Sequence, residues 1–180
     1  MTSTATATSH AAGPRRDLGR ALVQGAIGGL LAGAVFIGVT MWFVASMGNP
    51  ATQPFLLIST IVLGAGAMAA GTASVGLGVG VHAVLSILFG VIFALISPLF
   101  RTNGTIALAG GIYGGLLYVV NFLILGNTLL PQFLTGPNQP FELVVHLVYG
   151  HLLAVFVYSR GPRRGEPLLA FSRPGRSAAA

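Results

Sequence analysis

Long apolar segments separated by short polar stretches dominate the pattern along this chain. Residues about 21–47, 105–130 and 140–159 are each apolar and long enough to cross a bilayer as an α-helix. Residues 21–100 contain no Asp, Glu, Lys or Arg. An uncharged apolar run of about 18 residues already indicates a membrane-spanning helix. The pattern therefore predicts an all-α fold, a polytopic transmembrane helical bundle.

The block from Phe55 to Phe100 allows two topologies. Residues 75–99 form a convincing span, whereas residues 55–73 are rich in Gly and Ala. With five spans, residues 55–73 cross the membrane; with four, they form a short re-entrant or interfacial segment on the outer side. The four-span topology predicts a transmembrane domain at 20–160, with spans at about 21–47, 75–99, 105–130 and 140–159.

The placement of the arginines favours four spans. The net charge is +6, and all nine basic Lys/Arg positions are arginines, at 15, 16, 20, 101, 160, 163, 164, 173 and 176. Four spans put all of them on one side, and cytoplasmic segments of membrane proteins are enriched in Lys and Arg. We therefore expect a multi-pass protein of the cell (cytoplasmic) membrane. Its head at 1–19 is expected to be disordered and cytoplasmic, and its tail at 161–180 flexible and cytoplasmic.

The composition also limits the classes of binding partner and chemical site that we expect. Arginines that flank apolar spans are typical of orientation in a bilayer, so we expect the lipid bilayer as a partner and no nucleic acid. The chain has no cysteine, which excludes disulfides, thiolate metal sites and cysteine nucleophiles.

An internal repeat is predicted by two matching offsets. An offset of 86 residues aligns GGLL at 28–31 with GGLL at 114–117, and QPF at 53–55 with QPF at 139–141. An offset of 64 aligns Val81 and His82 with Val145 and His146. The difference falls in residues 55–73, which are then an insertion in the first repeat. This pattern predicts two related hairpins of parallel topology.

The segments GVHAVLSILFGVIFALI at 80–96, GGIYGGLLYVVNF at 110–122 and HLVYGHLLAVFVY at 146–158 carry a resemblance. Over residues 20–160 the chain resembles small bacterial four-span integral membrane proteins of unknown function, and more loosely the YagU-like inner-membrane proteins. The resemblance implies location in the inner membrane and a four-span topology, and it adds no chemistry.

Glycines spaced four residues apart form the pairs Gly25/Gly29, Gly29/Gly33, Gly76/Gly80 and Gly111/Gly115. This spacing places both glycines on one helix face, where another backbone can approach closely. We favour packing inside a single bundle. The alternative is an interface with a second copy of the chain or with another membrane protein.

His82 and His146 lie at similar depth in uncharged spans, and ionisable residues at such depth usually face the bundle interior. We expect each imidazole to hydrogen-bond inside the bundle, to a carbonyl, to a hydroxyl, to Asn121 or to the other histidine. We favour the two histidines as mutual neighbours that pair directly or through one water. One alternative is a pair of axial ligands for haem b or a metal. The other is a path for a proton or solute.

Glu142 is the only acid between Asp17 and Glu166. Capping of the last span is its simplest role, because a carboxylate is stabilised at a helix N-terminus, and a proton or cation site is the alternative. His151 is turned by about 140° from His146 around the helix, so it is a poor co-ligand.

The few polar residues assemble no Ser/His/Asp set, phosphate loop or pair of carboxylates. We therefore expect no enzyme, no resident metal and no cofactor. The expected role is that of a structural, accessory or stress-related membrane protein. The alternative is a haem-binding, metal-binding or proton- or solute-translocating protein that uses His82 and His146.

Overall fold

A computed structural model of the chain describes residues 18–100 and 102–158, and every regular element within them is helical. The tail expected at 161–180 and nearly all of the head expected at 1–19 lie outside the described residues. The α-helices are α1 (Leu18–Ser46), α2 (Gln53–Leu63), α3 (Val75–Ile96), α4 (Asn103–Tyr118), α5 (Leu125–Thr128), α6 (Pro131–Thr135) and α7 (Gln139–Tyr158). Three shorter elements join them, namely η1 (Ala65–Ala67), η2 (Ser97–Leu99) and η3 (Val119–Ile124).

Four helical segments are long and apolar enough to cross a membrane. They cover Leu18–Ser46, Val75–Leu99, Asn103–Thr128 and Gln139–Val157, close to the predicted spans. The third span runs without interruption through α4, η3 and α5. The prediction of an all-α, four-span membrane bundle is confirmed.

The Gly/Ala-rich segment after the first span does not form a fifth span. Its helix α2 has 11 residues, which rise about 16 Å, whereas a bilayer core is about 30 Å thick. The chain then turns through Gly64 and Gly71, whose φ angles of 88° and 69° suit glycine because it has no Cβ. Residues 53–73 therefore form the short helix α2, the element η1 and the turns that follow, at one end of the bundle.

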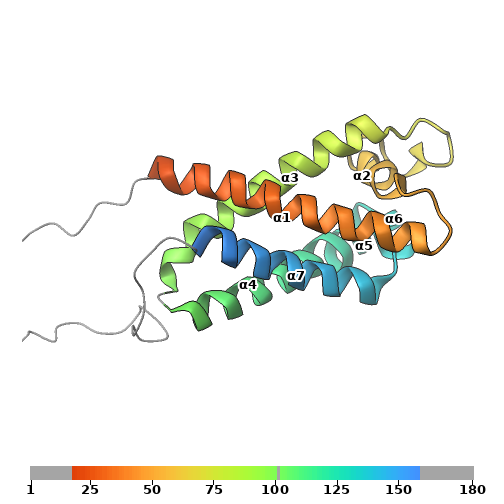
Figure 1. The fold of residues 1–180 in the computed structure, drawn as a ribbon. Helices are drawn as coiled ribbons and strands as arrows, with labels where there is room; N and C mark the ends of the chain where they lie inside the picture. Colours follow the sequence, from red (N-terminus) through yellow and green to blue (C-terminus); the bar gives the residue numbers. More distant parts are fainter. Residues whose placement is uncertain (1–17, 101, 159–180) are drawn as a thin grey trace, which may run out of the picture.

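The long helices lie side by side, and the ends of the described chain share one end of the bundle (Figure 1). α1 packs against α3 and α7, and α4 packs against α7. The start of α1, the junction of α3 with α4 and the end of α7 lie at the left in Figure 1, and α2 and α6 lie at the right. An even number of spans returns the chain to the side from which it started.

Glycines allow the closest helix contacts. A Cβ atom on Gly29 of α1 would overlap the Ser86 carbonyl of α3, and one on Gly25 would lie 2.6 Å from the Val91 Cα atom. A Cβ atom on Gly114 of α4 would likewise overlap the His146 carbonyl of α7. Within the described residues, the Gly25/Gly29/Gly33 series thus packs inside the bundle, as we favoured from its spacing.

The contacts between α1 and α3 match those between α4 and α7, but at a different sequence offset from the one that the GGLL match predicts. Gly29 faces Ser86 and Gly33 faces His82, whereas Gly110 faces Gly150 and Gly114 faces His146. The partners on α3 and α7 keep the predicted offset of 64, but the glycines on α1 and α4 differ by 81 and not by 86. The GGLL match therefore does not correspond to equivalent contacts, and the duplication itself stays a prediction.

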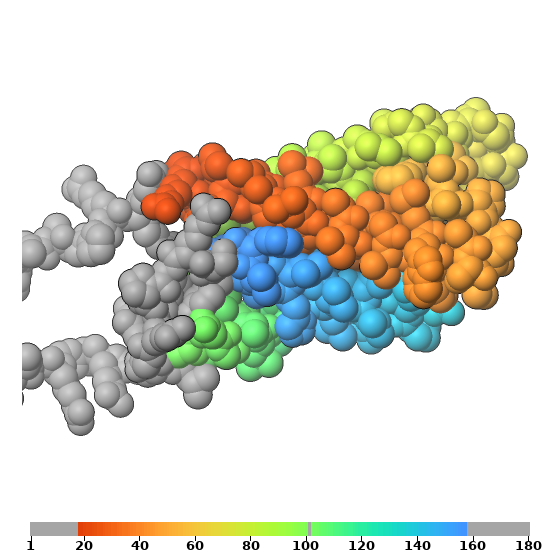
Figure 2. Space-filling model, viewed as in Figure 1, coloured from red at the N-terminus to blue at the C-terminus, as the bar shows by residue number. Residues whose placement is uncertain are grey.

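Many large apolar side chains are exposed on the outside of the bundle. Figure 2 shows one face of this outer surface, with α1 and α7 in front. Trp42 is 68% exposed, Val84 64%, Leu108 63% and Val155 61%. Buried Phe93 and Leu153 form the centre of the core together with Ala32. Since apolar groups on the surface are stable in contact with lipid chains, this distribution agrees with a multi-pass protein in a bilayer.

Candidate functional site

A cavity of about 200 Å³ lies among α1, α2, α3, η3, α6 and α7. Its wall is mostly aliphatic and aromatic. The polar residues in the wall are Thr40, His82, Ser86, Asn121, Glu142, His146 and Tyr149. A cavity of about 150 Å³ is enough to hold benzene, so this one has room for a small molecule. The cavity brings together four of the five polar residues that the sequence singled out.

Each histidine in the cavity wall has a backbone carbonyl as hydrogen-bond partner. His82 Nε2 lies 3.0 Å from the Gly33 carbonyl oxygen across the α1–α3 contact. His146 Nδ1 lies 2.6 Å from the Glu142 carbonyl oxygen one turn earlier in α7. A carbonyl can only accept, so these ring nitrogens carry the protons. In the neutral imidazole the second nitrogen of each ring is then an acceptor.

Each imidazole thus has a carbonyl partner, which is one of the partners expected from the sequence, and within the described residues no direct hydrogen bond joins His82 to His146. A pair bridged by one water stays a prediction. The hydrogen bonds found for the two rings within the described residues go to carbonyls and, for His82, also to Ser86 Oγ at 3.4 Å. Phe36 of α1 is the neighbour that they share. Its ring centroid is 6.1 Å from that of His82 and 4.9 Å from that of His146. The histidines thus share a cavity and an aromatic neighbour.

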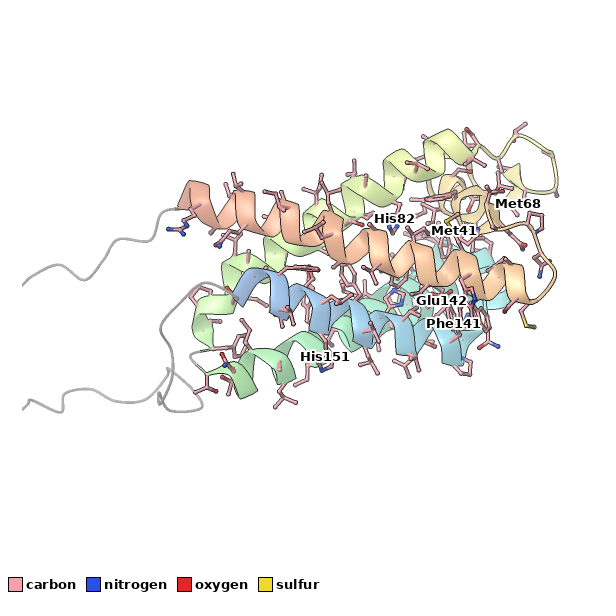
Figure 3. All side chains as sticks on the ribbon, in the orientation of Figure 1. Met41, Met68, His82, Phe141, Glu142 and His151 are labelled. Atoms are coloured by element: carbon pink, nitrogen blue, oxygen red, sulfur yellow. The ribbon has the colours of Figure 1, made fainter. Side chains whose placement is uncertain are left out.

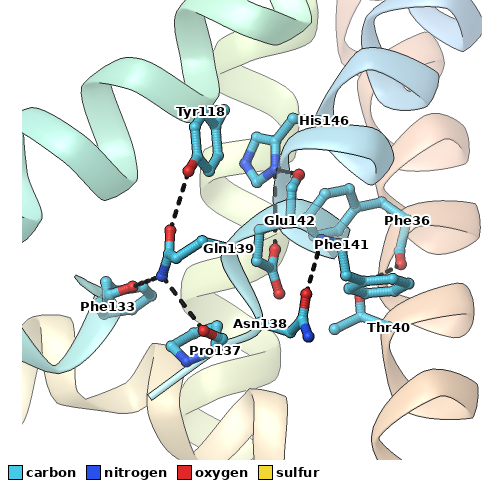
Figure 4. Close-up of polar contacts among 10 residues, drawn as sticks. All are labelled: Phe36, Thr40, Tyr118, Phe133, Pro137, Asn138, Gln139, Phe141, Glu142 and His146. Atoms are coloured by element: carbon cyan, nitrogen blue, oxygen red, sulfur yellow. Dashed lines mark hydrogen bonds and ion pairs between the residues drawn. The ribbon is translucent and has the colours of Figure 1, made fainter. Parts of the chain in front are cut away.

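Glu142 is not the residue that caps α7. Asn138 precedes the helix, and its Oδ1 accepts a hydrogen bond of 3.0 Å from the Phe141 backbone N–H (Figure 4). This is the usual contact of an N-terminal cap. Glu142 is only 6% exposed and lines the cavity, with Oε2 at 3.9 Å from His146 Nδ1. Its carboxylate remains near the positive end of the helix dipole, but it faces inward.

Asn121 reaches the cavity from an irregular turn of the third span. Residues Val119–Ile124 form a π-helix, with wider turns than the α-helices on either side. Such turns are often found at functional sites because they change the direction of side chains. Phe122 from the same turn lies 5.2 Å from His146, measured between ring centroids. The π-helix therefore supplies both a polar and an aromatic part of the wall.

Two short helices, α2 and α6, contribute residues to the cavity wall. They lie at the end of the bundle opposite the described chain termini (Figure 1). Gln132 Nε2 of α6 donates to Thr60 Oγ1 of α2 at 2.9 Å. Gln139 Nε2 donates to the Phe133 carbonyl at 2.9 Å, and Tyr118 Oη donates to Gln139 Oε1 at 3.2 Å (Figure 4). These bonds tie the two short helices and α7 together.

His151 and the remaining glycine pairs lie away from this site. His151 is exposed, its Nδ1 bonds the Leu147 carbonyl at 2.7 Å, and its ring packs over Gly111. Figure 3 places it apart from His82 and Glu142. Among the described residues, a Cβ atom on Gly76 would meet only Ser74 Oγ, at 4.0 Å, and one on Gly80 would meet nothing within 4 Å. A Cβ on Gly115 would make an ordinary contact with Leu147 at 3.5 Å.

Sequence reasoning missed three residues of the site: Phe36, Phe122 and the cap Asn138. Asn138 carried a usable signal, because Asn directly before Gln-Pro-Phe fits a helix N-terminus. Phe36 and Phe122 carried none, since an aromatic residue in an apolar span can face lipid or the interior equally well.

No protein-family model matches the chain, and neither the curated proteins nor the solved structures yield a match.

Proposed function

We propose that this protein is a non-enzymatic membrane protein whose bundle holds a small, mainly apolar molecule in the cavity beside His82 and His146. The observation that carries the proposal is the cavity itself. Its walls are predominantly apolar, and a few polar groups converge on it, which is the usual composition of a small-molecule site. An accessory or stress-related role in the cell membrane is compatible with such binding.

The proposed orientation has both chain ends in the cytoplasm. The described ends of α1 and α7 lie at one end of the bundle, and arginines adjoin these ends in the sequence. The positive-inside bias then favours that end as the cytoplasmic one. The cavity, α2 and α6 lie toward the outer face under this proposal.

Haem is a poorer occupant of the cavity than a small molecule. The Phe36 ring stacks on His82 and meets His146 edge-on. Two axial imidazoles need a ligating nitrogen each and a flat space between them. The Phe36 ring takes up space beside both imidazoles, so the residues present do not fit this group.

The proposal is tested by binding of para-fluoro-tert-butylbenzene to the full chain in lipid nanodiscs, followed by fluorine NMR. A protein-bound signal distinct from the lipid-dissolved one is expected. Ile58→Trp, which fills the cavity from α2, should abolish that signal. Val84→Trp adds the same bulk to a 64% exposed position on α3 and should leave it unchanged. Equal signals in both variants would contradict the proposal.

A further inference from the structure

We infer that the molecule held in this cavity is a small organic cation with an apolar body, such as an aryl or alkyl ammonium ion. The inference rests on the proposed binding function and adds the charge of the ligand. It is carried by three properties of the wall: one acidic side chain without a basic counterpart, a surplus of hydrogen-bond acceptors, and several aromatic rings around the histidine next to the acid.

The acidic side chain is that of Glu142, a residue that is only 6% exposed. No Lys or Arg occurs among the described residues that line the cavity. The nearest titratable neighbour is His146, but its Nδ1–H is directed to the Glu142 backbone carbonyl at 2.6 Å, whereas the carboxylate Oε2 lies at 3.9 Å. In an apolar cavity a carboxyl group stays neutral unless a cation lies beside it, so the ionised form of Glu142 needs a cationic partner. A bound cation supplies this partner.

The other polar groups in the wall mainly accept hydrogen bonds. His82 and His146 each use one N–H on a carbonyl, which leaves their second nitrogens as acceptors. Tyr149 Oη donates to the Ser86 carbonyl at 3.3 Å, and Thr40 Oγ1 donates to the Phe36 carbonyl at 2.9 Å. Their oxygen lone pairs remain. The Asn121 amide and the Ser86 hydroxyl can also donate, but acceptors are the majority in the wall. A ligand with N–H groups or positive charge therefore matches this wall better than an anion does.

Aromatic rings surround His146, the histidine next to the acid. The ring centroids of Phe36, Phe122 and Tyr118 lie 4.9, 5.2 and 6.0 Å from that of His146. Phe36 and Phe122 are themselves part of the cavity wall. The faces of aromatic rings attract cations within about 6 Å of the centroid, and this attraction increases where water is excluded. The rings also accommodate the apolar body of the ligand.

The experiment compares two probes of the same shape. Para-fluorophenyl-trimethylammonium carries a positive nitrogen where para-fluoro-tert-butylbenzene carries a neutral carbon. Both are titrated into the full chain in nanodiscs and followed by fluorine NMR, with concentrations corrected for partition into empty nanodiscs. We expect the cation to bind at least about tenfold more tightly than the neutral probe. Glu142→Gln should remove this preference, and circular dichroism of the variant in the same nanodiscs reports whether it is folded.

The outcomes separate the two proposals. Equal affinity for both probes, or a preference for the cation that persists in Glu142→Gln, would overturn the inference about charge while leaving a small-molecule site. If Glu142→Gln also loses binding of the neutral probe, Glu142→Asp is measured, because it retains the charge and should retain the preference for the cation. Loss of that preference in Glu142→Asp would also overturn the inference. Binding of neither probe to the native chain would overturn the proposed function as well.

Discussion

Phe36 of α1 meets His146 of α7 edge-on, with ring centroids 4.9 Å apart and ring planes inclined at 85°. The same phenylalanine ring is nearly parallel to that of His82 on α3, at 6.1 Å and 23°. One side chain of the central helix therefore connects the polar groups of its two neighbours. α1 itself packs against both α3 and α7, which places Phe36 where the three helices meet.

Double-mutant cycles should reveal this arrangement. Phe36→Leu and His146→Leu remove the edge-on contact, and we expect a coupling free energy of about 0.5–1.5 kcal/mol between them. His82→Leu and His146→Leu should couple by less than about 0.5 kcal/mol, since the rings bond separate carbonyls. The measurement is reversible unfolding in mixed micelles. A coupling between the histidines that exceeds the coupling between Phe36 and His146 would show that the two imidazoles meet directly.

Gly29→Ala and Gly114→Ala should each destabilise the bundle by about 1–3 kcal/mol, because the added Cβ overlaps a backbone carbonyl of the neighbouring helix. Gly38→Ala is the matched control on α1, where a Cβ meets nothing within 4 Å. It should be neutral or stabilising by up to about 1 kcal/mol, since alanine is the better helix former. The same unfolding assay measures all three. Similar losses in all three variants would mean that helix contact is not the cause.

Asn138→Ala should lower the free energy of unfolding by about 0.5–2 kcal/mol, because it removes the acceptor for the Phe141 N–H at the start of α7. Asn138→Asp keeps a side-chain oxygen in the same place and should lose much less. Both variants are compared with the native chain by thermal unfolding in detergent. If alanine and aspartate reduce stability equally, the side-chain cap contributes nothing.

The turn after α2 should be accessible from the aqueous side opposite the chain termini. The chain has no cysteine, so single cysteines can be introduced without a background. Ala65→Cys and Ala69→Cys are exposed and should react with an impermeant maleimide from outside. Ala67→Cys, at 5% exposure, and Val84→Cys, on the membrane-facing surface of α3, should be protected. Protection of all four positions would place this segment within the bilayer.

A reporter fused after Gly165 should report a cytoplasmic C-terminus, because four spans return the chain to its starting side and the arginines at 160, 163 and 164 favour the cytoplasm. A paired alkaline phosphatase and green fluorescent protein fusion at this position measures the orientation. Phosphatase activity with no fluorescence would reverse the proposed orientation of both ends, and with it the side from which the cavity is reached.

The fold class and the four long apolar segments could be predicted from the sequence, whereas four spans were only favoured over five by the placement of the arginines. Transfer of a helix into lipid depends on the summed hydrophobicity of its residues, which is a local quantity that needs no knowledge of neighbours. The second and fourth spans begin at Val75 and Gln139, close to the predicted starts at 75 and 140. His82, His146, Glu142 and Asn121 could be selected because polar groups are rare in such segments.

Tertiary structure alone decided which of these groups meet. A membrane helix is apolar on every side, so periodicity does not identify its inward face, and GGLL aligned the two halves in a register that the packing does not use. The sequence favoured Glu142 as the cap of the last span, whereas in the structure the Asn138 side chain makes the capping hydrogen bond. Phe36, which lies against both histidines, acquires its place only when glycines let α1 approach α3 closely, because helix rotation and register are set by the fit of backbones and not by hydrophobicity.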